Sequence, residues 1–115
     1  MKPRSGKNKG RRLQNFVRDM LQDTFPDLHK DDIKSQTMGM PGEDIVLSPA
    51  ARDIIPYSFE CKNVERLDLW KSLSQAETNS ADREPVLVIK RNRSKVYAIL
   101  ELDTFLDLIG NNNEI

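Results

Sequence analysis

The fold and the candidate chemistry both depend on one stretch of sequence, Tyr57-Ser58-Phe59-Glu60-Cys61-Lys62 (residues 57–62). Apolar and polar residues alternate through it, and successive side chains of a β-strand point to opposite faces of the sheet. The alternation therefore predicts a strand that packs its aromatic residues and Cys61 against helices. The other face of this strand carries Glu60 and Lys62 side by side.

The segments before this strand predict a helix, two strands and a short helix. Apolar residues from Leu13 to Leu21 recur at helical spacing after Gly10, and Phe25-Pro26-Asp27 ends that helix. We expect strands at residues 32–38 and 43–47 around a turn at 39–42, then a short helix from Pro49 to about Ile54 with Ser48 as its N-cap.

The segments after the central strand complete the fold. We expect a helix at residues 67–78, strands at 85–90 and 96–100 joined by a turn at 92–94, and a helix at 102–109 that Gly110 ends. Helices and strands in this order predict an α/β fold, with a central mixed β-sheet of about five strands flanked by helices.

Length and composition limit the class of protein. A chain of 115 residues is long enough for one small domain. We expect a basic flexible arm at residues 1–9, a single domain at 10–110 and a frayed tail at 111–115. No apolar run is long enough to cross a membrane, and one cysteine with one histidine excludes a disulfide or a zinc finger within this chain. A reducing, cytoplasmic location is the default expectation.

The charges are balanced in number but segregated along the chain, with 18 basic and 18 acidic residues. Two segments are strongly basic; their cations are Lys2, Arg4, Lys7, Lys9, Arg11 and Arg12 in the first and Lys90, Arg91, Arg93 and Lys95 in the second. Such clusters are typical of a face that binds phosphate, so both are candidate DNA-binding segments. The alternative is a solvated tail and a solvated strand edge.

A candidate metal site follows if the strand at 43–47 lies beside the strand at 57–62. Asp44 and Glu60 would then converge, and two neighbouring carboxylates repel each other unless a cation lies between them. Mg²⁺ is suited to such oxygen ligands, and Lys62 would lie close to its bound water. Glu43 is the rival of Asp44, because the register of the strand is not fixed by the sequence. The alternative is a solvated Glu-x-Lys face with a weak ion pair.

Asp44 followed by Glu60-Cys61-Lys62 on a core strand, and then by a helix carrying Gln75, resembles the PD-(D/E)XK nuclease superfamily. The opening Gly10-Arg11-Arg12-Leu13-Gln14 is similar to the start of small archaeal and phage Holliday-junction resolvases. Residues 10–108 as a whole also resemble small phage-encoded nucleases of this superfamily. Two features depart from the pattern: Glu43 stands where the motif proline would precede Asp44, and Gln14 stands where resolvases carry a metal-binding Glu.

The resemblance implies a restriction-endonuclease-like α-β-β-β-α-β core and a phage- or prophage-encoded, Mg²⁺-dependent endonuclease that cuts branched DNA, with Mn²⁺ as a possible substitute. The metal ligands would be Asp44 and Glu60, with the backbone carbonyl of Cys61 and the amide of Gln14. Lys62 would assist the attacking water. Gln75 would orient Lys62 or a phosphate, and Ser35 would support catalysis. Enzymes of this type act as homodimers, and the helix at 102–109 is a candidate interface.

Two other functions remain open at this point. One is a different phage nuclease of the same superfamily, namely a nicking enzyme, a flap enzyme or a general duplex enzyme. The other is a DNA-binding protein without catalytic activity on a degenerate nuclease scaffold, which Gln14 favours because an amide brings no charge to a metal.

Overall fold

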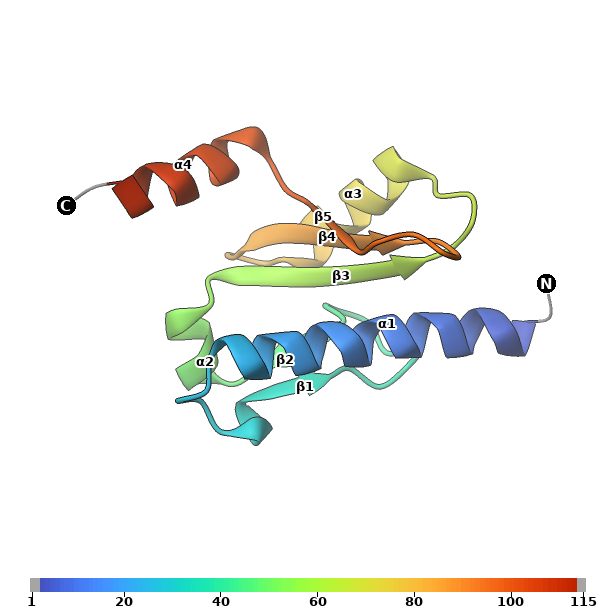
Figure 1. Ribbon diagram of the computed structural model, residues 1–115, viewed down its shortest axis with the longest axis horizontal. Helices are drawn as coiled ribbons and strands as arrows, with labels where there is room; N and C mark the ends of the chain where they lie inside the picture. The colour runs from blue at the N-terminus through green and yellow to red at the C-terminus, as the bar shows by residue number, and fades with distance from the viewer. Residues whose placement is uncertain (1–2, 114–115) are drawn as a thin grey trace.

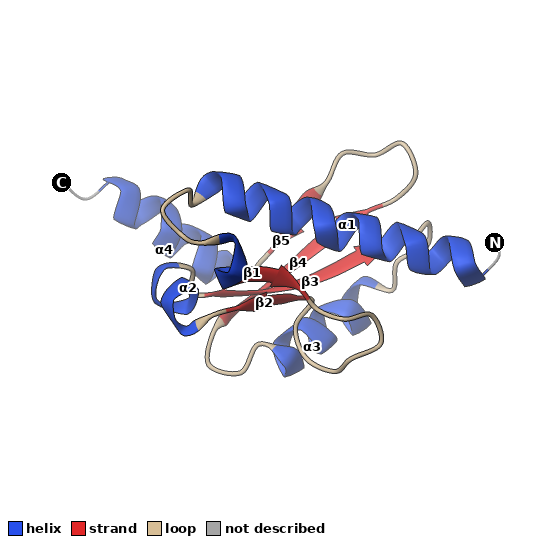
Figure 2. Ribbon diagram, turned by 90° about the horizontal axis from the view of Figure 1, so that it is seen from below, coloured by secondary structure: helices blue, strands red, loops and turns tan. Residues whose placement is uncertain are grey.

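The computed structural model describes residues 3–113, which form four α-helices, one 3-10 helix and five β-strands. In chain order they are α1 (Pro3–Thr24), η1 (Lys30–Asp32), β1 (Ile33–Ser35), β2 (Ile45–Leu47), α2 (Pro49–Ile54), β3 (Tyr57–Asn63), α3 (Leu69–Asn79), β4 (Glu84–Lys90), β5 (Tyr97–Ile99) and α4 (Leu102–Asn113). Figures 1 and 2 show β3, β4 and β5 lying between α1 on one side and α3 on the other.

The strands form two separate ladders. β1 pairs antiparallel with β2, placing Ile33 opposite Leu47. β3 pairs parallel with β4, placing Glu60 opposite Leu87, and β4 pairs antiparallel with β5. The predicted α/β class and the mixed sheet are confirmed, but the prediction of one central sheet of about five strands is wrong.

The two ladders meet at Asp44, and the contact there explains why they do not merge. The Asp44 N–H donates to the Phe59 carbonyl at 3.0 Å, which is a backbone bond of the kind that joins strands. The next donor along β3, the Cys61 N–H, is taken by the Asp44 carboxylate at 2.7 Å. A side chain thus occupies the position where β2 would have continued pairing, and the expected ladder between residues 43–47 and 57–62 does not form.

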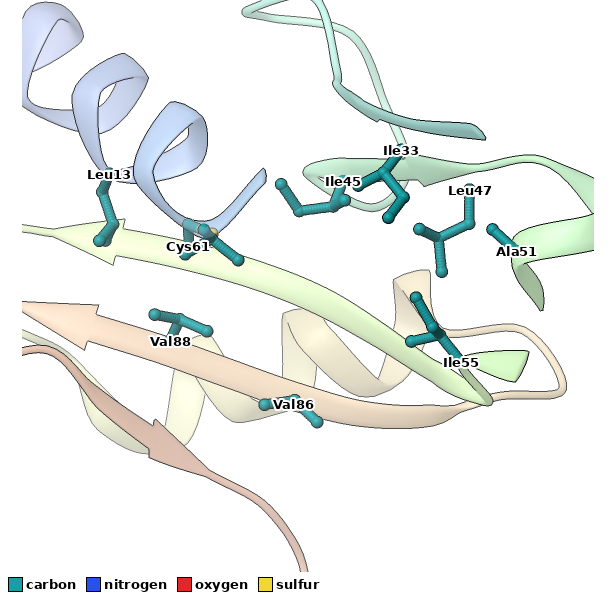
Figure 3. Packing of buried hydrophobic residues seen from close by; sticks show 10 residues of the cluster. Leu13, Ile33, Ile45, Leu47, Ala51, Ile55, Cys61, Val86 and Val88 are labelled. Atoms are coloured by element: carbon teal, nitrogen blue, oxygen red, sulfur yellow. The ribbon is translucent and has the colours of Figure 1, made fainter. Parts of the chain in front are cut away.

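The core lies on the α1 side of the sheet. Figure 3 shows Cys61 of β3 near Leu13 of α1, with Val88 of β4 on the same face. The isoleucines and leucine of the β1–β2 ladder extend this core toward α2. Because strand residues alternate faces, the even-numbered residues of β3 point to the α3 side, where Leu87 is fully buried. Glu60 and Lys62 therefore stand on the α3 face, as the alternation of residues 57–62 predicted.

The first helix begins seven residues before its expected start at Gly10. α1 includes residues 3–9, so this part of the predicted flexible arm is helical, while Met1 and Lys2 lie outside the described residues. Proline is well tolerated at the first position of a helix, and the two glycines within it, Gly6 and Gly10, cost only about 1 kcal/mol each. Lys9 shows why the helix extends: it is only 6% exposed and packs against the body of the protein.

The last helix also continues beyond its expected end. α4 runs through Gly110 to Asn113, so residues 111–113 of the predicted frayed tail are helical, and residues 114–115 lie outside the described part. In Figure 1, α4 leaves the end of the sheet and extends away from α1. Within the described residues, no helix combines the length and the apolar character that crossing a membrane requires.

Candidate metal and phosphate site

Asp44 is held directly beside Glu60. Its backbone and its side chain bond to Phe59 and Cys61, the two residues that flank Glu60 along β3. The predicted convergence of the two carboxylates is therefore achieved, although by a side-chain bond instead of a ladder. The N–H and C=O of one strand residue point to the same edge, so the Cys61 carbonyl also faces the edge at which Asp44 lies.

Both carboxyl groups titrate at raised pH because of this placement. Burial raises the pKa of Glu60 to about 7, and the neighbouring charge of Asp44 adds to the effect, against the opposing Asn79 hydrogen bond and Lys62. Burial also raises the pKa of Asp44, opposed by the Cys61 N–H, by Lys62 and by Gln14. Glu60 is only 4% exposed. The structure thus concentrates negative charge in a place with little water.

Lys62 is the cation of this cluster, since its charge lowers the pKa of both carboxyl groups. The Cys61 side chain, in contrast, points into the core, and burial raises the pKa of its thiol far above the ordinary value. That thiol stays protonated at neutral pH and is not a nucleophile. Cys61 contributes to the cluster through its backbone alone.

Gln14 of α1 reaches the site as predicted, but as a hydrogen-bond donor. Its Nε2 donates to the Asp44 carbonyl at 3.3 Å, and its side chain also bonds the Asp44 carboxyl group. Gln14 is 5% exposed, so a neutral amide here places no third negative charge in the buried cluster. This buried amide stabilises Asp44 in the absence of a metal.

Asn79, which the sequence analysis missed, is the α3 residue that contacts the site. Its Nδ2 donates to Glu60 Oε2 at 3.4 Å. Gln75, the expected α3 residue, lies one helical turn earlier and is exposed, without a hydrogen bond to Glu60 or Lys62 among the described residues. The spacing of four residues puts both amides on one helix face, and this spacing is the signal that could have identified Asn79.

Ser35 of β1 lies beside Asn15 and Gln14 of α1 and not at the Asp44 and Glu60 carboxylates. Its hydroxyl donates to Asn15 Oδ1 at 2.9 Å, and it lines a hollow of about 320 Å³ that Gln14 and Arg11 also line. The structure therefore brings Ser35 near Gln14 and leaves it without a bond to Asp44 or Glu60 among the described residues.

Glu43, the rival of Asp44, is held in a different set of contacts. It forms a short ion pair with Arg83, receives a hydrogen bond from Ser58 at 3.4 Å, and lies 3.8 Å from Arg52. Its charge is neutralised by two guanidinium groups, so it is not an available ligand. The structure separates the two acids that the sequence left as alternatives.

The predicted DNA-binding cations differ in their surroundings. Lys9 is the exception to the prediction: its ammonium group pairs with Glu65 at 3.3 Å, and its carbonyl accepts from Asn63. It is a structural residue that fastens α1 to the loop after β3. The exposed cations are Lys7, Arg11, Arg12, Arg91, Arg93 and Lys95, and Lys90 is half-buried.

The two basic segments meet at the carboxyl ends of β3 and β4, which α1 extends past in Figure 1. On the α3 face, Lys62, Lys90 and Arg91 line a hollow of about 330 Å³. On the α1 face, Arg12, Lys90 and Arg93 line a groove of about 630 Å³. Glu65 positions this edge, because it accepts from both Lys9 and the Asn92 N–H.

The described residues contain no group of three or more His, Cys, Asp or Glu side chains arranged to hold a metal ion. The site therefore offers two carboxylates, supplemented by the Cys61 carbonyl and the Gln14 amide. No protein-family model matches this chain, and no curated protein or solved structure matches it either.

Proposed function

We propose that this protein is a Mg²⁺-dependent endonuclease that hydrolyses phosphodiester bonds in branched DNA, in the manner of a Holliday-junction resolvase. The observation that carries the proposal is the pair of neighbouring carboxylates, Asp44 and Glu60, beside Lys62. Like charges gathered in a poorly solvated place are unfavourable unless a cation joins them. Lys62 supplies one positive charge to this pair, and a divalent ion would supply the balance.

The donor set fits a hard cation that prefers oxygen and retains several waters. Asp44 and Glu60 would be the charged ligands, and the Cys61 carbonyl faces the same edge. Gln14 could add its amide oxygen, because its bond to Asp44 uses the amide nitrogen. Mg²⁺, or Mn²⁺ in its place, would activate water and neutralise phosphate charge.

Lys62 is the residue to which we assign transition-state stabilisation. It lies between the carboxylates and the hollow that Lys90 and Arg91 also line. Its ammonium group can orient the attacking water and neutralise the charge that develops on the phosphoryl oxygens. One water and one phosphodiester bond then give a phosphomonoester end and a hydroxyl end.

Binding of DNA is supported by the two basic hollows at the carboxyl ends of β3 and β4. They lie on opposite faces of the sheet and share Lys90. Contacts of this kind fix the position of the phosphate backbone without reading its sequence. A strand of DNA that touched both hollows would bend over the sheet edge, which branched DNA does more easily than a straight duplex.

A second copy of the chain is the partner we assign to α4. Leu102, Phe105 and Leu106 are exposed on this helix, and Leu102 is 69% exposed. The same chain has an apolar groove of about 620 Å³ between α1 and β5, with Lys95 among its lining residues. Two copies related by a two-fold axis could each place an acidic, apolar α4 against Met20, Leu21 and Tyr97 of the other, leaving Phe16, which also lines this groove, uncovered.

The direct test is cleavage of a four-way junction and of a linear duplex of equal length, with Mg²⁺, Mn²⁺ or EDTA. We expect junction cleavage that needs the metal, and losses of at least about 100-fold in Glu60→Gln and Lys62→Met, because one preorganised charge contributes roughly that much. Glu77→Gln, an exposed change on α3, is the control. Cleavage that survives EDTA, or full activity in both site variants, would exclude this mechanism.

Flapped and nicked duplexes in the same assay separate resolvase activity from that of another phage nuclease. A non-catalytic DNA-binding function is the second candidate, and Gln14 is the observation that favours it, since this buried amide leaves the cluster with only two acids. It predicts DNA binding that weakens with salt, no cleavage of any of these substrates, and no heat of Mg²⁺ binding in titration calorimetry.

A further inference from the structure

The groove on the α1 face has the mixed chemistry of a nucleotide site, not only of a phosphate contact. Its apolar wall comes from Leu13 and Phe16 of α1 and from Val96 in the loop before β5. Lys9 also lines it but is paired with Glu65, and its other cations are Arg12, Lys90 and Arg93. Phe16 is 46% exposed, whereas Leu13, one helical turn before it, is buried. An exposed aromatic ring beside three cations suits a flat apolar base joined to a phosphate.

The position of the groove links it to the candidate metal site. Asn63 lines the groove and directly follows Lys62, so the two side chains point to opposite faces at the end of β3. Lys90, opposite Asn63 in the ladder, lines the hollows on both faces. The cations thus form a path from the Glu60 face over the sheet edge to Phe16.

A strand that followed this path would lose its base stacking at the edge. Neighbouring bases stack only while the backbone runs smoothly, and here it would turn around the ends of β3 and β4. A base freed from its stack could then contact the ring of Phe16 within the groove. A fully paired, straight duplex could offer its phosphates to Arg12 and Arg93 but not a base to Phe16.

Asn63 adds a second observation at the same place. Its Nδ2 donates to the Lys9 carbonyl, and its Oδ1 is buried without a hydrogen-bond partner among the described residues. A buried acceptor without a donor is unfavourable. Unpaired bases carry free N–H groups that paired bases do not. A small rotation of Asn63 toward the groove would let such an N–H donate to the Asn63 Oδ1, so that each group gains a hydrogen-bond partner.

We propose that this groove binds one unpaired, unstacked nucleotide of a DNA strand whose neighbouring phosphate lies at Asp44, Glu60 and Lys62. The inference rests on the proposed function, since that function places DNA at the sheet edge. It deepens that function by naming the feature of the substrate that is recognised. Selectivity for branched DNA would come from the free nucleotide that a branch point supplies.

The test is equilibrium binding in EDTA, in which cleavage plays no part. Fluorescent duplexes of equal length are compared, one fully paired and one with a single unpaired thymidine at its centre. We expect the protein to bind the second duplex about tenfold more tightly, a size typical of one base stacked on an aromatic ring. Phe16→Ala and Asn63→Leu should lose this preference while retaining their affinity for the paired duplex.

Trp70→Ala is the control, because Trp70 is an exposed aromatic residue of α3 on the other face of the sheet, and it should retain the preference. Circular dichroism establishes that each variant is folded. Equal binding of both duplexes by the wild type, or a preference retained in both groove variants, overturns the inference and leaves the metal-dependent cleavage assay unaffected. A wild-type protein that prefers the duplex with the unpaired thymidine but cleaves no DNA in the presence of metal would instead overturn the proposed nuclease.

Discussion

At the scale of single residues, the buried carboxyl groups of the candidate site destabilise the metal-free fold. Glu60 is buried beside Asp44, and its pKa of about 7 lies above the ordinary value of 4.5. Burying a carboxyl group without a full complement of donors disfavours its ionised form. The cation that we propose would offset this cost by joining the two carboxylates.

The metal-free protein should therefore lose stability as the pH rises. Below pH 4.5 Glu60 is protonated in both the folded and the unfolded state. Between pH 4.5 and about 7 the unfolded state ionises first, so the free energy of unfolding falls, by about 3 kcal/mol in all, and then levels off. The raised pKa of Asp44 acts in the same direction. Urea unfolding in EDTA at pH 5 and pH 8 measures this.

Glu60→Gln should flatten that pH dependence and should make the metal-free protein more stable at pH 8. The Asn79 amide can still donate to the glutamine oxygen, so the variant retains that contact. Glu77→Gln is the matched control, since Glu77 is an exposed residue of α3, the helix that carries Asn79. A wild-type stability equal at the two pH values would contradict the burial of an ionisable Glu60.

At the scale of elements, one side chain joins the two ladders. The Asp44 carboxylate accepts the Cys61 N–H, while the Asp44 N–H bonds to the Phe59 carbonyl. Ser48 acts in a similar way at the other end of β2, where it caps α2 and bonds to Asp32 before β1. Short strands of three residues are weak on their own, so such polar contacts determine where the β1–β2 ladder lies.

Asp44→Asn and Asp44→Ala should separate the structural role of this residue from its charge. Asparagine can still accept the Cys61 N–H through its side-chain oxygen, so we expect little change in stability. Alanine leaves that N–H without its partner and should lower the free energy of unfolding by about 1–3 kcal/mol. Thermal unfolding in EDTA measures both. Equal stability of the two variants would show that the Cys61 contact does not hold the ladders together.

At the scale of the whole molecule, α4 stands apart from the rest of the fold. It is fastened by the Thr104 hydroxyl, which bonds to Glu84 at 3.0 Å, while its apolar residues face outward. Contiguous exposed apolar surface of this kind marks an interaction site. The groove beside β5 offers a matching surface on the same chain.

The protein should sediment as a dimer, and Leu106→Glu should make it monomeric. A charge placed in the α4 interface would have to be buried without a partner. Asn111→Glu introduces the same side chain at a polar, exposed position of α4 and should leave the dimer intact. Sedimentation velocity over a hundredfold range of concentration measures both. A wild type that remains monomeric at the highest concentration would exclude the two-fold arrangement.

The sequence by itself determined the features that depend on neighbouring residues. Alternation through residues 57–62 was enough to place Glu60 and Lys62 on one face of a core strand. Helical spacing located α1, α3 and α4, although α1 begins seven residues before its expected start and α4 ends four residues after its expected end. The α/β class follows from the order of these elements. All of this depends on periodicity, which is a property of adjacent residues along the chain.

Only the tertiary structure decided which groups become partners. Arg83 neutralises Glu43 across 40 residues and leaves Asp44 to join Glu60, and Lys9 pairs with Glu65 across 56 residues instead of pointing into solvent. The same is true of the division into two ladders and of the groove that joins Arg12 to Arg93. These outcomes depend on the packing of distant segments, and periodicity within each segment carries no information about that packing.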